Sequence, residues 1–115
     1  MTANAEQHID IGALQDLKEI MEGEFETLIN TFIQDSSSKL DELEAAIATA
    51  DADALRKVAH SLKGSSSNIC AGPMSELAKQ LEFLGKEGSV TGAQTILAHL
   101  RTEFATVQTL LKSHL

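Results

Sequence analysis

The chain of 115 residues has one cysteine, one proline and neither tryptophan nor tyrosine. A lone cysteine excludes an intrachain disulfide and a cysteine-rich metal site. Aromatic residues make up only 3% of the chain, which argues against a stacking platform for single-stranded nucleic acid. The formal net charge of −8 disfavours non-specific binding to a phosphate backbone.

Long apolar runs are also missing, because none approaches the roughly 20 residues that a membrane span needs. The first ten residues lack the basic-then-apolar order of a secretory signal. We therefore expect a cytoplasmic protein that binds neither a membrane nor nucleic acid. The length is enough for one domain and too short for two ordinary ones.

The sequence is rich in residues that favour helices. Ala, Leu, Glu, Lys and Gln are abundant, and apolar residues recur every three or four positions rather than every two. This pattern predicts a short helix over about 11–21 and a long one over about 24–50. A third helix would begin near residue 51 or 53, a fourth would cover about 73–84, and a fifth would run from about 91 to the end.

Capping residues mark these boundaries. Asp10 precedes the first helix, and Asp51 or Asp53 precedes the third, where an aspartate side chain can accept from first-turn N–H groups. The other boundary signals are Gly72-Pro73 between the third and fourth helices, Gly85 and Gly88 after the fourth, and Ser89 or a Thr91-Gly92-Ala93-Gln94 capping box before the fifth.

Four long amphipathic helices joined by short loops predict an all-α fold, an antiparallel four-helix bundle. The short N-terminal helix would lie across one end of it. We expect one domain over residues 9–115 and a disordered segment over residues 1–8. The serines at positions 36–38 would be a weak spot in the second helix rather than a break.

Positive charge gathers around one histidine of the third helix. The first 55 residues carry a net charge of −11, whereas the rest carry +3. Arg56, Lys57 and Lys63 lie three or four positions from His60, which makes them its neighbours on a helix surface. Clustered cations of this kind suit a phosphoryl group.

A helical wheel points His60 away from the apolar face, about 140° from Leu55 at about 100° per residue. Gly64 and Ser67 follow one and two turns later, and their small size leaves space beside the imidazole. A mid-helix glycine costs roughly 1 kcal/mol relative to alanine, so its presence favours close approach by a large partner. The alternative at this point is an ordinary solvated histidine.

Residues 59–66, Ala-His-Ser-Leu-Lys-Gly-Ser-Ser, resemble the signature of the histidine-containing phosphotransfer (HPt) domain. That signature is His, any residue, an aliphatic residue, Lys, Gly and then small residues. The helix pattern from about Asp10 to Leu115 fits the bundle of the family, and the chain is similar to a stand-alone bacterial HPt protein. One departure is Cys70, where relatives often have glycine; the wheel places it as a packing residue at the edge of the apolar face.

The resemblance implies a phosphorelay intermediate that is not an enzyme. His60 would accept a phosphoryl group from an aspartyl phosphate on the receiver domain of a hybrid sensor kinase. It would pass the group to the receiver domain of a response regulator. Lys63 would balance phosphoryl charge, and Gly64 would clear room for the aspartyl phosphate. The supporting residues would be Arg56, Lys57 and Ser67.

The resemblance also implies what the chain does not carry. The Mg²⁺ of the reaction would belong to the partner receiver domain, so we expect no cofactor or metal on this chain and a monomeric protein. An exposed apolar patch beside His60 would dock the partner. The candidates for this patch are Ile9, Ile11, Leu14, Leu28 and Phe32, and core packing is the alternative for each.

The main alternative function is a helical module that binds receiver domains or other signalling proteins without carrying phosphate. A kinase is disfavoured because the chain has neither a phosphate-binding G-x-x-x-x-G-K-[ST] loop nor a catalytic Asp/Asn set. A metal site is disfavoured because no histidine has another histidine four residues away or a glutamate three residues before it.

Overall fold

The computed structural model describes residues 7–115, which form five α-helices and no strand. The helices are α1 (Ile11–Met21), α2 (Phe25–Ala48), α3 (Ala52–Asn68), α4 (Gly72–Lys86) and α5 (Ala93–Lys112), with a 3₁₀ turn at Glu22–Glu24. No helix among these residues is long and apolar enough to cross a membrane.

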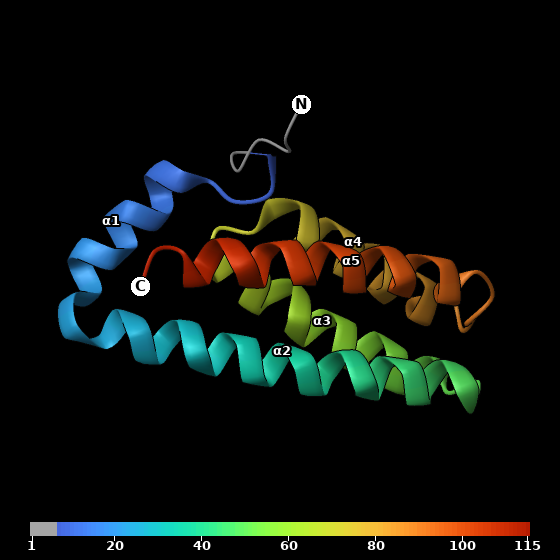
Figure 1. Cartoon of the computed structure of the whole chain (residues 1–115). Coiled ribbons are helices and arrows are strands. Elements are labelled where there is room, and N and C mark those ends of the chain that lie inside the picture. The colour runs from blue at the N-terminus through green and yellow to red at the C-terminus, as the bar shows by residue number, and fades with distance from the viewer. Residues whose placement is uncertain (1–6) are drawn as a thin grey trace.

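The helices α2 to α5 run alternately up and down beside one another, and α1 lies across one end of them (Figure 1). The predicted all-α, antiparallel four-helix bundle with a short N-terminal helix is therefore confirmed. Lys18 of α1 donates a hydrogen bond of 2.6 Å to the carbonyl oxygen of His114. This contact ties α1 to the end of α5.

Two aspartates begin helices as the sequence predicts. The backbone N–H of Ala13 donates to Asp10 Oδ1, and that of Ala54 donates to Asp51 Oδ1, both at 3.0 Å. The prediction for α5 is wrong, because no side chain caps its first turn. Its N-cap is Gly92, in the left-handed region at φ 83°, and the nearby serine hydroxyl accepts from the loop instead.

Three helices end in the same hydrogen-bonded turn, the Schellman motif. The left-handed residue of this turn is Ala50 after α2, Cys70 after α3 and Gly88 after α4. At α3, the N–H of Ala71 donates to Ser66 O at 2.9 Å, and the N–H of Cys70 donates to Ser67 O at 3.0 Å.

This turn corrects two predictions about the end of α3. The helix stops at Asn68, before the Gly72-Pro73 pair, which lies in the first turn of α4. Cys70 is not on the helix at all; it has φ 68°, a conformation that glycine adopts without steric cost. The left-handed backbone at this position explains why related chains often have glycine there. Cys70 adopts the same backbone conformation despite the steric cost of its Cβ.

Gly85 lies inside α4 and does not end it, contrary to the prediction. A Cβ at this position would lie 2.7 Å from the backbone oxygen of Ala52 and 2.7 Å from the backbone nitrogen of Arg56. No side chain fits there, so Gly85 lets α4 pack backbone to backbone against α3. These two helices form the most extensive contact in the bundle.

Every helix contributes buried apolar side chains to the core, which consists mainly of leucine, alanine and isoleucine with few aromatic rings. Two serines are also fully buried, Ser36 in α2 and Ser66 in α3, and neither hydroxyl has a hydrogen-bond partner among the described residues. These two serines therefore act in the core as small side chains that allow close helix packing, and their hydroxyl groups form no hydrogen bond there. Helix α2 continues unbroken through Ser36, as predicted.

The segment before α1 lies against the bundle. The expected disorder covers residues 1–8. Residues 1–6 lie outside the described part of the chain, and the structure describes residues 7 and 8. His8 has a definite place, because its Nδ1 lies 2.8 Å from Glu103 Oε2 of α5. Ile9 is buried, and the N–H of Asp10 donates to Cys70 O at 2.9 Å.

Candidate functional site

His60 stands on the outer face of α3, where 65% of its side chain is exposed. Its neighbours Ala59 and Leu62 are fully buried, because the apolar face of the helix turns toward the core. The outward direction predicted from the helical wheel is therefore confirmed. An exposed imidazole on a rigid helix is open to a partner protein.

The imidazole is held by a carboxylate from the next helix. Glu82 of α4 is 4% exposed, and its Oε2 lies 2.7 Å from His60 Nδ1. Its Oε1 lies 2.7 Å from Lys63 Nζ, and Lys86 Nζ is 3.8 Å from Oε2. One buried carboxylate thus binds both the histidine and the lysine of the HPt-like signature.

Its surroundings keep Glu82 ionised. The hydrogen bond from Lys63 lowers the pKa of Glu82 to about 2, with help from the His60 hydrogen bond and the charge of Lys86, against the opposing effect of burial. An ionised carboxylate only accepts hydrogen bonds, so Nδ1 of His60 carries the proton. In the neutral ring the lone pair is then on Nε2, which has no hydrogen-bond partner among the described residues.

The other two cations near His60 are occupied by a different acid. Arg56 and Lys57 lie one turn before His60, and both bind Asp53, each with a nitrogen 3.0 Å from a carboxylate oxygen. The hydrogen bond from Arg56, followed by that from Lys57, lowers the pKa of Asp53. Ion pairs therefore engage all three of the cations that cluster around His60, because Asp53 binds Arg56 and Lys57 and Glu82 binds Lys63.

The two small residues on this face of α3 leave open space, as the sequence indicates. A Cβ built on Gly64 would meet no atom within 4 Å, so the glycine is not required by packing within the protein. Ser67 is exposed two turns beyond His60 and lines a cavity of about 380 Å³ between the start of α1 and the α3–α4 connection.

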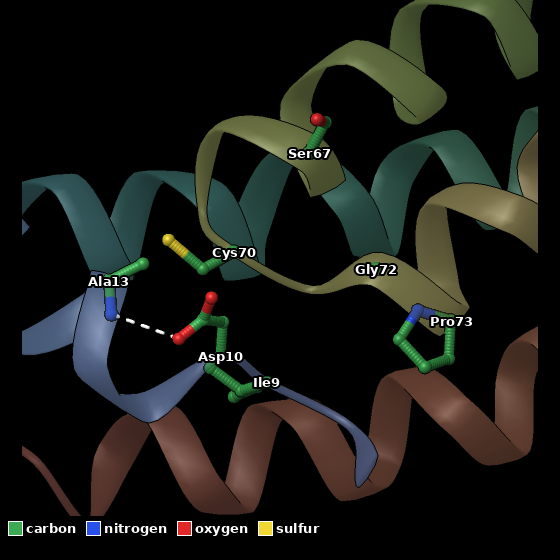
Figure 2. A pocket seen from close by; sticks show the side chains of 7 residues that line it. All are labelled: Ile9, Asp10, Ala13, Ser67, Cys70, Gly72 and Pro73. Atoms are coloured by element: carbon green, nitrogen blue, oxygen red, sulfur yellow. Dashed lines mark hydrogen bonds between the residues drawn. The ribbon is translucent and has the colours of Figure 1, made fainter. Parts of the chain in front are cut away.

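Figure 2 shows the residues that line this cavity, with the Cys70 sulfur pointing toward Ala13 and the Asp10 carboxylate beside them, where it accepts from the Ala13 N–H. Burial raises the pKa of the Cys70 thiol, and the negative charge of Asp10 adds to the shift. The sulfur therefore stays protonated and weakly reactive at neutral pH. His60 does not line this cavity. The cavity is therefore separate from the imidazole site, although Ser67 of α3 lines it.

The expected docking patch is mostly core. Ile9, Leu14 and Phe32 are 1%, 0% and 6% exposed, because they pack beneath α1 and between α2 and α3. Their selection as exposed residues is wrong for that reason. Ile11 and Leu28 are half-buried, and Leu28 lines a shallow cavity between α2 and α3 together with Phe32.

Sequence reasoning missed Glu82, although a signal was present. Glu82 comes four residues after Ala78, so it falls on the apolar face of α4 where a charged residue is out of place. A buried acid needs a cationic or hydrogen-bonding partner. The sequence could have led from that anomaly to the His60 and Lys63 side chains of the neighbouring helix.

Within residues 7–115, no group of three His, Cys, Asp or Glu side chains is arranged to hold a metal ion. The site consists instead of one imidazole, one buried carboxylate and two lysines. This arrangement can present a neutral ring nitrogen to an electrophile and surround the product with positive charge.

Comparison with known proteins identifies the family of the chain. Residues 27–110 match the Hpt domain family. Histidine-containing phosphotransfer protein B (HptB) from Pseudomonas aeruginosa PAO1 is 39% identical, with a TM-score of 0.90 and 93% of each chain covered. Histidine-containing phosphotransfer protein ZmHP2 from maize has the same fold at 24% identity and a TM-score of 0.79, with 89% of this chain and 85% of the maize chain covered. No match was found among curated proteins.

The matched segment contains His60, Lys63, Gly64 and Glu82, so the site lies inside the family's domain. With 39% identity to HptB over nearly the full length, the similarity extends beyond the fold. The chain belongs to the histidine-containing phosphotransfer (Hpt) family and acts as an intermediate in a phosphorelay.

Proposed function

We propose that His60 is the phospho-acceptor of this protein. It takes the phosphoryl group from an aspartyl phosphate on the receiver domain of a hybrid sensor kinase and passes it to the receiver domain of a response regulator. The observation that carries this proposal is the geometry at the ring. His60 is 65% exposed, and a buried carboxylate binds its Nδ1 and leaves Nε2 free.

The transfer step needs no proton movement. Nε2 attacks phosphorus, the new N–P bond forms, and the acyl phosphate P–O bond breaks to release the aspartate carboxylate. The ring gains positive charge as the bond forms, and Glu82 stabilises that charge through the Nδ1–H hydrogen bond. The reverse reaction onto a second aspartate follows the same path, because phosphohistidine keeps a high transfer potential.

Lysines balance the charge that arrives with the phosphoryl group. Lys63 Nζ is bound to Glu82 and one third of its side chain is exposed, so it can turn toward Nε2 when the phosphoryl group arrives. Lys86 is 3.8 Å from the same carboxylate and can then compensate Glu82. Arg56 and Lys57 supply a second, partly neutralised positive surface one turn away.

Gly64 gives the donor aspartate room, because the space where its Cβ would lie is empty. Ser67 continues this uncrowded strip along α3. The Mg²⁺ that assists phosphoryl transfer would arrive with the receiver domain. The contribution of this chain is positioning and electrostatics.

The test is transfer from a receiver domain that carries a radiolabelled aspartyl phosphate. We expect wild-type protein to gain an acid-labile, alkali-stable label and the His60→Gln variant to gain none. His99→Gln is the matched control, since His99 is an exposed histidine of α5 away from Glu82. Wild-type protein that binds receiver domains but stays unlabelled would indicate the binding module instead.

A further inference from the structure

Phe83 is an exposed aromatic ring next to the site. It follows Glu82 directly in α4 and is 61% exposed, one of three large apolar side chains in residues 7–115 that are exposed. The other two, Ile20 and Leu115, lie at the end of α1 and at the last residue. An exposed aromatic ring beside a reactive group is a frequent mark of an interface.

Two hollows flank the ring, and Phe83 lines both of them. The first has a volume of about 110 Å³ and is lined by Lys63, Lys79, Glu82, Phe83 and Lys86. The second has a volume of about 280 Å³ and is lined by Glu76, Lys79, Gln80, Phe83, Leu84 and Ile96. The ring therefore separates two recesses, the first of which reaches the carboxylate that binds His60.

The exposed charge around the first hollow is positive. Glu82 is its only acid, and that carboxylate is buried and already bound by His60 and Lys63. Lys79 forms no ion pair with any described residue, and the side chain of Lys86 is 60% exposed. On a chain with a net charge of −8, three lysines around one buried acid leave this hollow with an excess of positive charge, which suits an acidic partner.

We propose that Lys79, Phe83 and Lys86, which we call the α4 face, dock the acidic surface of the partner receiver domain. This inference rests on the proposed function, since such a domain brings both an aspartyl phosphate and the carboxylates that bind its Mg²⁺. In this docking mode Phe83 supplies the apolar contact, and Lys79 and Lys86 lie against the acidic surface.

Charge decides against two other occupants of the α4 face. A second copy bound through a two-fold axis would place these lysines against their own counterparts, which is unfavourable. Nucleic acid needs an extended basic surface to contact several phosphates, whereas the α4 face offers only two lysines. The receiver domain also approaches His60 in any case, and the α4 face lies next to the Glu82 that holds that histidine.

Removal of this surface should weaken docking without changing the chemistry at His60. We expect Phe83→Ser to raise the dissociation constant for the receiver domain at least tenfold. We expect Lys79→Glu to slow association and to flatten its dependence on salt concentration. Both variants should accept phosphate from the small donor phosphoramidate at the wild-type rate, because that donor needs no docking surface.

The experiment measures three quantities for wild type and variants, with the receiver domains of the source organism as probes. These are calorimetric affinity, the rate of transfer from labelled receiver domain, and the rate of labelling by phosphoramidate. The matched controls are Leu115→Ser for the exposed apolar residue and Lys112→Glu for the charge reversal. Both are exposed at the end of the bundle where α5 finishes.

Weaker binding in both α4-face variants, with normal phosphoramidate labelling and unaffected controls, would support the docking surface. Wild-type affinity in Phe83→Ser and Lys79→Glu would overturn it, even if His60 carries phosphate. The proposed function fails separately, when wild-type protein binds receiver domains without accepting label. If no receiver domain binds wild-type protein, the docking surface is also wrong.

Discussion

Glu82 Oε2 lies 2.7 Å from Nδ1 of His60, although the two residues are 22 positions apart and belong to different helices. The same carboxylate binds Lys63 through its other oxygen. The histidine and the lysine of the motif are therefore not two independent surface residues. They form one unit with a buried acid that the motif does not contain.

The first prediction concerns the pH dependence of stability. The pKa of Glu82 falls from its ordinary 4.5 to about 2, so ionised Glu82 stabilises the fold above about pH 4.5, and this contribution is lost as pH falls through about 2. We expect wild type to lose about 2 kcal/mol more than Glu82→Gln across this window, less than the full shift implies because Lys63 is partly exposed. Urea unfolding at stepped pH measures the difference.

Other carboxylates titrate in the same window, so the comparison with Glu82→Gln is the essential one. Asp53→Asn serves as a control, because Asp53 is an exposed acid whose pKa is also lowered by cations. Parallel curves for wild type and Glu82→Gln would mean that His60 and Lys63 do not stabilise the carboxylate.

Lys63 is expected to act on the phosphoryl group in addition to stabilising the Glu82 carboxylate. Lys63→Ala should slow transfer onto His60 or shorten the lifetime of phosphohistidine by about tenfold, the effect of roughly 1.4 kcal/mol of lost electrostatic stabilisation. Rapid-quench kinetics with a labelled receiver domain measures both steps. Unchanged kinetics would remove Lys63 from the mechanism.

The substitution Gly64→Ala should raise the stability of the protein and lower its rate of phosphoryl transfer. Gly64→Ala adds a methyl group in open space and removes a flexible residue from mid-helix, so the protein should gain up to about 1 kcal/mol of unfolding free energy. The same methyl group intrudes where the donor aspartate approaches, so transfer should slow. Thermal unfolding and transfer rates on one sample test both halves; a more stable variant with full activity would show that the space is not used.

The same substitution at Gly85 should lower the stability of the protein. Its Cβ would lie 2.7 Å from backbone atoms of α3 that cannot move aside easily, so Gly85→Ala should destabilise the bundle by about 2 kcal/mol or more. Gly23→Ala provides the control, because nothing lies within 4 Å of a Cβ there. Equal melting temperatures for Gly85→Ala and wild type would contradict the close approach of α3 and α4.

The turn after α2 offers a stabilising substitution. Ala50 is exposed and has φ 53°, a conformation that costs an L-residue about 1 kcal/mol and glycine almost nothing. Ala50→Gly should therefore raise the unfolding free energy by about 0.5–1 kcal/mol. Chemical denaturation measures the change. A loss of stability would mean that the turn does not hold residue 50 in the left-handed region.

Much of the fold could be predicted because it depends on local rules. Apolar spacing located the five helices, and Asp10 and Asp51 located two of their starts. The ends of the helices were harder. Cys70 and Ala50 take left-handed conformations that their residue types do not announce, and Gly85 was mistaken for a stop signal because its packing partner lies on another helix.

The candidate site was predictable only in its outward half. A motif and a helical wheel were enough to predict that the His60 side chain is exposed and that Gly64 leaves space beside it. The inward half depends on tertiary contact, which is why Glu82 went unnoticed. The same cause explains the docking residues, since Ile9 and Leu14 are apolar candidates that the packing of the N-terminal segment and α1 against the bundle buries.

The contact at Gly85 sets the distance between α3 and α4, and the Glu82–His60 hydrogen bond spans that distance. A wider spacing of α3 and α4 would lengthen this hydrogen bond, which keeps the proton of the neutral ring on Nδ1. A substitution at Gly85 should therefore be visible in the nitrogen chemical shifts of His60, although Gly85 does not contact the imidazole. The imidazole of His60 therefore reports on the packing of α3 against α4.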